Sequence, residues 1–247
     1  MKRFPTAGLL LLLLTGAAHA QYDAGATAGL GQGMMLNNSA IGAAVMGDVI
    51  LQQGRRTAGP DAGGSRDRSA VSEASLAALR FHPSDEVSQA VLDRIARQFG
   101  GRQPDTYRRA LIRDGVLARF GDRLQQLGYD SHDVADAYTA YLVLSWEVAN
   151  DGNAMQYRSG IDALRRSMRQ ALARNPRFTS MPDAQKQEMA ETFGYLAMIA
   201  VATRDELRRK GDQTGLARLR DGVNGMAQKM GVNLRAIRMT PQGFVAL

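Results

Sequence analysis

Three acidic residues in one helical segment have the clearest potential for chemistry in this chain. Asp133, Asp136 and Glu147 fall on one narrow stripe when residues 128–151 are placed on a helix of about 100° per residue. Carboxylates of this kind serve as acid/base groups in glycosidases, and they also line acidic binding grooves. The alternative interpretation is structural: the helix buries an aromatic face and turns a solvated or salt-bridged acidic face away from it.

The spacing of the carboxylates favours the structural interpretation. Asp136 and Glu147 are separated along a helix by about 16 Å, whereas the paired carboxylates of glycosidases lie about 5–10 Å apart. Asp133 and Asp136 are close enough to interact, but two carboxylates offer too few oxygen atoms for a calcium site. We therefore expect an ion-pair network between this stripe and the arginines of the following helix, which are Arg158, Arg165, Arg166 and Arg169.

The other chemistry-bearing patterns are weak. His82 and His132 belong to no H-E-x-x-H motif, no G-x-S-x-G occurs, and we expect both histidines at the surface. Gly29, Gly31 and Gly33 lack the preceding strand and the following Lys-Ser/Thr of a phosphate-binding loop. The chain has no cysteine, which excludes thiol nucleophiles and thiolate metal sites. The sequence therefore predicts no catalytic residue, no cofactor-binding residue and no metal site.

The first 20 residues have the pattern of an export leader. Lys2 and Arg3 precede the apolar run 9–14, and Ala18-His19-Ala20 offers the small residues that signal peptidase accepts. The run is too short to cross a bilayer, which needs about 20 apolar residues. We predict a signal peptide over residues 1–20, cleavage after Ala20, and a periplasmic or secreted mature chain with no transmembrane span.

Residues 21–73 form a glycine-rich segment. Its first part, residues 21–64, holds 10 glycines. Ordering such a stretch costs much entropy and buries little apolar surface, so we predict a flexible N-terminal tail. Residues 34–53 are more apolar, and they are compatible with a strand, a docking helix or a partner-binding segment.

Residues 74–247 show helical periodicity and are predicted to form one domain. The expected helices begin near Pro83–Glu86, Pro104, Asp130 or Ser131, Ala154 and Pro182, and a sixth carries Leu216 to Met230. Residues 193–202 are apolar all round, so we expect them in the most buried helix. Phe244-Val245 suits a short extended piece. The predicted fold is an all-α bundle of five to seven helices with this C-terminal piece and the flexible tail.

The charge is positive but spread over the chain. Loss of Lys2 and Arg3 with the leader lowers the formal net charge from +7 to +5. Residues 204–210, with Arg218 and Arg220, predict a basic patch that suits an anionic envelope component. Nucleic-acid binding would need interleaved aromatic residues or a known module, and neither is present.

Three stretches resemble an uncharacterised family of exported bacterial all-helical proteins, a domain of unknown function. The residues that carry the resemblance are Gly128-Tyr129-Asp130, residues 133–138, Tyr141, Trp146 and Asn150; residues 172–176 and 182–187; and Leu234, Ile237, Met239-Thr240 and residues 243–245. The resemblance covers roughly residues 80–247. It implies a compact helical domain behind a signal peptide, and it implies no activity, so no catalytic residue is carried over.

These observations predict a non-enzymatic envelope or secreted protein that binds a partner. The partner is an unidentified protein or an anionic envelope component. The alternative is a hydrolase directed at the cell wall that uses Glu147, the least unsuitable acidic residue for that role.

Overall fold

The structure is a computed structural model that describes residues 71–247. The predicted leader (residues 1–20), most of the glycine-rich segment and the apolar stretch 34–53 lie outside the described residues, so the expectations for them stay predictions. Within residues 71–247, no helix is both long enough and apolar enough to cross a membrane.

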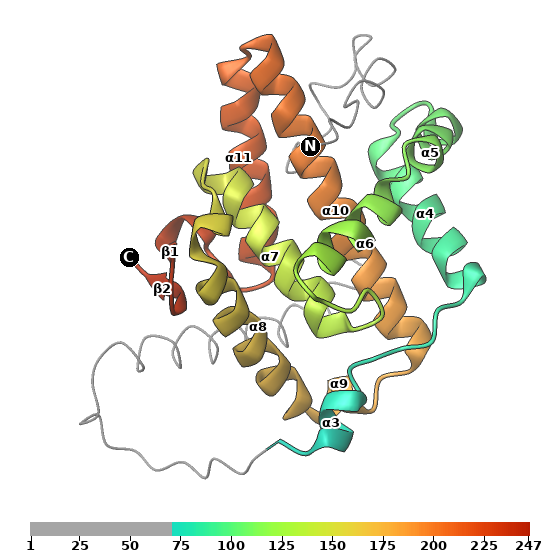
Figure 1. The fold of residues 1–247 in the computed structure, drawn as a ribbon. Helices are drawn as coiled ribbons and strands as arrows, with labels where there is room; N and C mark the ends of the chain where they lie inside the picture. Colours follow the sequence, from blue (N-terminus) through green and yellow to red (C-terminus); the bar gives the residue numbers. More distant parts are fainter. Residues whose placement is uncertain (1–70) are drawn as a thin grey trace.

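The described part of the chain is all-α, as predicted, with seven α-helices of ten or more residues (Figure 1). They are α4 (Asp85–Phe99), α5 (Pro104–Arg113), α6 (Val116–Gln126), α7 (Val134–Asn150), α8 (Arg158–Ala173), α10 (Asp183–Lys210) and α11 (Gln213–Lys229). Shorter helical pieces are α3 (Glu73–Ala77), η3 (Ala154–Tyr157), α9 (Pro176–Thr179) and η4 (Leu234–Ala236). Two strands, β1 (Ile237–Thr240) and β2 (Gly243–Ala246), end the chain.

Helix α7 begins later than the sequence suggested, at Val134 rather than near Asp130 or Ser131. The segment before it pairs with residues ahead of α4 instead: the Phe81 N–H donates to the His132 carbonyl over 2.9 Å. The Asp133 side chain then caps the helix by accepting the N–H groups of Ala135 and Asp136, at 2.9 and 3.2 Å. An Asp at this position satisfies backbone donors that have no partner inside the helix.

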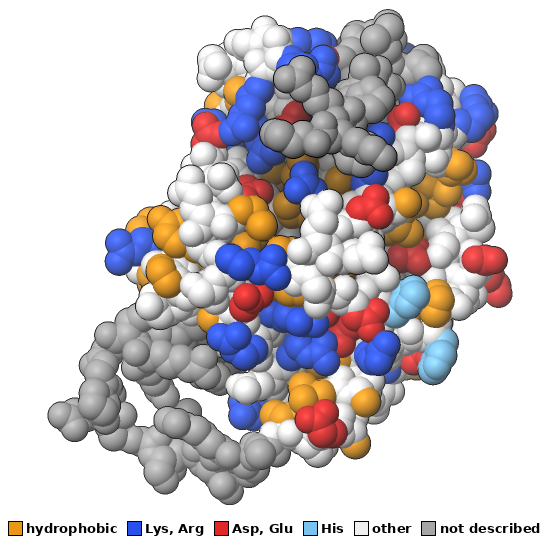
Figure 2. Space-filling view, viewed as in Figure 1, with side chains coloured by type: hydrophobic (Ala, Val, Ile, Leu, Met, Phe, Trp, Pro, Cys, Tyr) orange, Lys and Arg blue, Asp and Glu red, His pale blue; other side chains and the backbone are white. Residues whose placement is uncertain are grey.

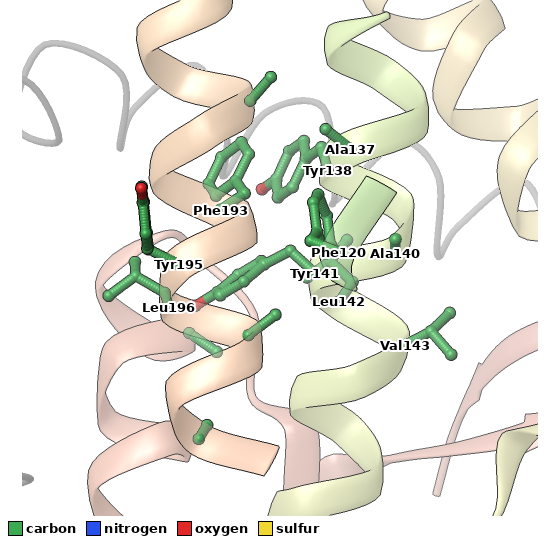
Figure 3. Close-up of a cluster of buried hydrophobic side chains, with 14 of the residues drawn as sticks. Phe120, Ala137, Tyr138, Ala140, Tyr141, Leu142, Val143, Phe193, Tyr195 and Leu196 are labelled. Atoms are coloured by element: carbon green, nitrogen blue, oxygen red, sulfur yellow. The ribbon is translucent and has the colours of Figure 1, made fainter. Parts of the chain in front are cut away.

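Helix α7 forms the centre of the core. It packs against α8, α10 and α11, and 14 of its 17 residues are buried (Figure 1). Tyr138 and Tyr141 on α7 stack on Phe193 of α10, with ring centroids 4.7 and 5.0 Å apart (Figure 3). Most of residues 193–202 are buried as expected, but α7 is the more completely buried helix. Its aliphatic and alanine positions surround the aromatic face, so no broad polar face remains.

The C-terminal extended piece is a two-stranded antiparallel hairpin, in which Ile237 pairs with Ala246 and Thr240 with Gly243. The sequence showed only its second strand, because strands of four residues are too short to reveal a period of two. Trp146 of α7 holds the hairpin: its Nε1–H donates to the Ile237 carbonyl over 3.0 Å. The hairpin also packs on α8, so it closes one side of the core.

Candidate functional site

The predicted acidic stripe is a buried ion-pair network between α7 and α8. Asp136 is fully buried and accepts two hydrogen bonds from Arg165, from Nε at 2.6 Å and from Nη2 at 2.5 Å. Asp133 is paired with Arg169, whose Nη1 also lies 3.5 Å from Asp136. A bidentate arginine–carboxylate pair fixes both distance and orientation. The network predicted for these four residues is therefore confirmed.

The two remaining arginines of the predicted set lie elsewhere. Arg158 lies 3.4 Å from Asp162 on its own helix and donates to the Leu127 carbonyl over 2.7 Å. Arg166 is exposed. The geometry of α8 explains the difference: Arg158 lies about two turns before Arg165 along the helix, and Arg166 is rotated by about 100° from Arg165.

Every oxygen of the two buried aspartates has a structural task. Asp136 Oδ2 accepts the N–H of Asp130 over 2.9 Å, and Asp133 Oδ1 caps α7. Burial, with a smaller contribution from the Asp136 charge, raises the pKa of Asp133, while Arg169 opposes this rise. The hydrogen bonds to Asp136 raise the pKa of Arg165. The arrangement fixes the loop before α7 and leaves neither carboxylate open to a substrate.

Tyr129 extends the network. The guanidinium carbon of Arg165 lies 4.4 Å from the centre of the Tyr129 ring, a cation–π contact. The Tyr129 hydroxyl donates to the Ile161 carbonyl over 3.3 Å, and burial raises the pKa of this hydroxyl. Tyr129 thus fastens the loop between α6 and α7 to α8.

Glu147 lies at the opposite end of α7 and is half-buried. Its Oε1 accepts the Ala154 N–H over 2.7 Å, at the start of η3. Burial raises the pKa of Glu147, and the Ala154 hydrogen bond and the charges of Arg204 and Arg123 oppose the rise. Glu147 therefore fixes the position of the loop before η3, and it does not lie on a flat exposed face.

Replacement of Glu147 by Gln should stabilise the protein at neutral pH. The amide oxygen keeps the Ala154 hydrogen bond, while the partly desolvated charge disappears. Because the folded-state pKa lies above the unfolded one, ionised Glu147 lowers stability above the folded pKa. We expect a gain of about 0.5 kcal/mol at pH 7, lost as the pH falls below the unfolded pKa of about 4.3. Urea unfolding at both pH values measures it, and a less stable variant at pH 7 would contradict this assignment.

His82 and His132 are exposed, as predicted. His82 Nδ1 lies 2.8 Å from the Asp183 carboxylate, and the His132 ring meets Phe81 edge-on with centroids 5.7 Å apart. Within residues 71–247, no group of three or more His, Asp or Glu side chains is placed to hold a metal ion.

The predicted basic patch is half neutralised, because its six basic side chains share three acidic neighbours, Asp151, Asp205 and Glu206. The ion pairs there are Arg204–Asp205, Arg208–Asp151, Arg209–Glu206, Lys210–Glu206 and Arg220–Asp151. Arg218 is exposed. Figure 2 shows basic and acidic side chains side by side on the face in view. Paired charges of this kind attract an anionic polymer less than the sequence alone suggested.

An open hollow of about 530 Å³ lies where α6, the loop before α7 and α8 meet. Gly121, Asp122 and Gln125 of α6 line one side, residues 128–131 line another, and Arg165 closes the third. Neither the polar residues of α6 nor Gly121 was among the candidate residues predicted from the sequence. The available signal was a glycine inside a helix, where it costs about 1 kcal/mol relative to alanine.

Comparisons with curated proteins and with solved structures gave no match. A family model matches residues 2–247, and so includes the leader and the glycine-rich segment that the resemblance did not cover. The chain belongs to this family, which is described as a family of unknown function (DUF6683).

Proposed function

We propose that this protein is an exported, non-enzymatic binding protein that attaches to a component of the cell envelope through the hollow between α6 and α8. The leader pattern supports export. The main support for a non-enzymatic function is the environment of Asp136. Its carboxylate is fully buried and already accepts hydrogen bonds from Arg165 and from the Asp130 N–H. A catalytic carboxylate must reach substrate.

The rival function, a hydrolase using Glu147, has one supporting feature, which is the raised pKa of that carboxyl group. The geometry favours it less. Glu147 accepts a backbone N–H, it does not line the hollow, and Asp136 on the same helix is about 16 Å away. A second carboxylate at catalytic distance is therefore not supplied by α7.

Binding to the envelope can be separated from hydrolysis in one assay. Residues 21–247, the chain after the predicted leader cleavage, are mixed with an isolated cell-envelope fraction and sedimented. We expect saturable binding and no release of soluble reducing sugar. Release of sugar that stops in the Glu147→Gln variant would overturn the proposal in favour of the hydrolase. Absence of binding would overturn it as well.

A further inference from the structure

We infer that the hollow between α6 and α8 binds a neutral, polyhydroxylated ligand of the saccharide class. This inference rests on the proposed binding function and names its ligand. The first support comes from polar side chains in the lining that make no ion pair or hydrogen bond with the rest of the described chain. Asp122 forms no ion pair within residues 71–247, and Gln125 and Ser131 are exposed without side-chain hydrogen bonds there. Three hydrogen-bonding side chains therefore face one open volume.

Arg165 supplies a fixed donor to the same volume. Its Nε and Nη2 atoms are bound by Asp136, and within residues 71–247 its Nη1 atom makes no hydrogen bond. Asp136 and the ring of Tyr129 hold the guanidinium in place, so a ligand would not have to order it. The hollow thus combines a preorganised donor with the acceptor oxygens of Asp122 and Gln125, which suits neighbouring hydroxyl groups.

The charges around the hollow argue against an anionic ligand. The positive charge of Arg165 is neutralised by Asp136, and Asp130 is paired with Arg80 at 2.8 Å. Asp122 then leaves the lining slightly negative. Among the residues that line the hollow, the one basic side chain is Arg165, so an anion would meet the Asp122 carboxylate without an unpaired lining cation to offset it. A neutral ligand uses the same groups through hydrogen bonds alone.

Gly121 gives the second line of support. The glycines Gly160 and Gly194 in other helices are explained by packing, since an added Cβ would lie 1.8 Å from the Thr240 carbonyl and 2.6 Å from Phe120. At Gly121 an added Cβ would meet nothing within 4 Å, although the residue lies inside α6. No packing contact of the described chain therefore requires glycine there. The same is true of Gly225 in α11, but Gly121 lines the hollow and Gly225 does not. We therefore assign the space beside Gly121, and not open space at a glycine in general, to the ligand.

The ligand should be held by hydrogen bonds rather than by ring stacking. Tyr129 is only 6% exposed, and Arg165 covers one face of its ring. Sites without an aromatic platform bind sugars weakly, so the test must detect weak binding. Amide chemical shifts meet this need, because Gly121, Gly128 and Ser131 all report from the lining.

The experiment titrates residues 21–247 with two neutral trisaccharides, triacetylchitotriose and cellotriose, and with trigalacturonate and spermidine as charged probes. We expect saturable shifts at the lining amides with a neutral trisaccharide. Comparison of triacetylchitotriose with cellotriose shows whether the site prefers an N-acetylated amino sugar or an unmodified hexose. Saturation by spermidine or trigalacturonate alone, or by no probe, would overturn the saccharide assignment. If envelope sedimentation persists in that case, only the ligand class fails.

Two variant pairs locate the ligand. Gly121→Ala should weaken neutral-sugar binding at least tenfold while its unfolding temperature equals or exceeds that of the wild type, because alanine favours the helix. Gly225→Ala makes the same change in α11, where an added Cβ also meets nothing within 4 Å, and should leave binding unchanged. Gln125→Ala should weaken binding and its neighbour Gln126→Ala should not. Equal binding by Gly121→Ala and wild type would overturn the placement.

Discussion

Asp136→Asn should lower the free energy of unfolding by about 3 kcal/mol, the lower end of the range for breaking a buried ion pair. Asparagine has nearly the same shape, so the loss reports charge and hydrogen bonding rather than packing. The variant leaves Arg165 with a partly buried, unpaired charge, since this side chain is 28% exposed. It also weakens the acceptor for the Asp130 N–H. Urea unfolding followed by circular dichroism measures the change.

The control is Asp162→Asn on α8. The Asp162 carboxylate is 40% exposed and lies 3.4 Å from Arg158, so we expect a change within about 0.5 kcal/mol. In a double-mutant cycle, Asp136→Asn with Arg165→Gln should cost less than the sum of the single variants, by about 1–3 kcal/mol. Additive costs, or a loss at Asp136 no larger than at Asp162, would contradict the network described here.

Gly160→Ala should destabilise the protein by about 3 kcal/mol and release the C-terminal hairpin. An added Cβ would lie 1.8 Å from the Thr240 carbonyl oxygen and 3.2 Å from the Gly243 nitrogen. Both atoms belong to the backbone of the turn, so the hairpin must move as a unit. Insertion of atoms into a closely packed contact typically costs about 1–3 kcal/mol, and this contact is among the tightest.

The single tryptophan of the chain reports this movement directly. Trp146 donates to the Ile237 carbonyl, and its ring centroid lies 6.1 Å from that of Phe244. We expect the Gly160→Ala variant to show red-shifted tryptophan emission. Gly225→Ala should keep the wild-type emission and gain about 0.5–1 kcal/mol, because its Cβ enters open space in a helix. Unchanged emission in Gly160→Ala would show that the hairpin does not depend on this close contact.

Most helix starts could be predicted from the sequence because proline, glycine and capping residues mark them locally. Pro104 begins α5, as expected. The helix expected from Pro104 onward is divided at Asp114-Gly115 into α5 and α6, and Gly115 adopts a φ of 57° that favours glycine. The predicted start of α7 was several residues too early, because a long-range contact determines where this helix begins. The Phe81 N–H donates to the His132 carbonyl, and no local sequence pattern predicts a hydrogen bond between residues so far apart in the chain.

The candidate site was predicted only in part. The ion pairs of Asp133 and Asp136 were predicted because the acidic residues share one face of their helix and the arginines follow on the next helix, which packs against it. The hollow depends on how α6, the loop after Gly128 and α8 approach one another, which periodicity does not specify. Gly121 was the one local sign of it. The partial neutralisation of the basic patch has the same origin, because Asp151, which lies far from it in the sequence, pairs with Arg208 and Arg220 only in the folded chain.

The most direct test of the binding function compares envelope sedimentation of the wild-type protein with that of Gly121→Ala, in the chain from residue 21 to residue 247. We expect the variant to remain folded, with an unfolding temperature at or above that of the wild type, while its affinity for the envelope fraction falls at least tenfold. Equal binding by the two proteins would contradict a ligand site in the hollow, because the added methyl group would then lie in a space that no ligand uses.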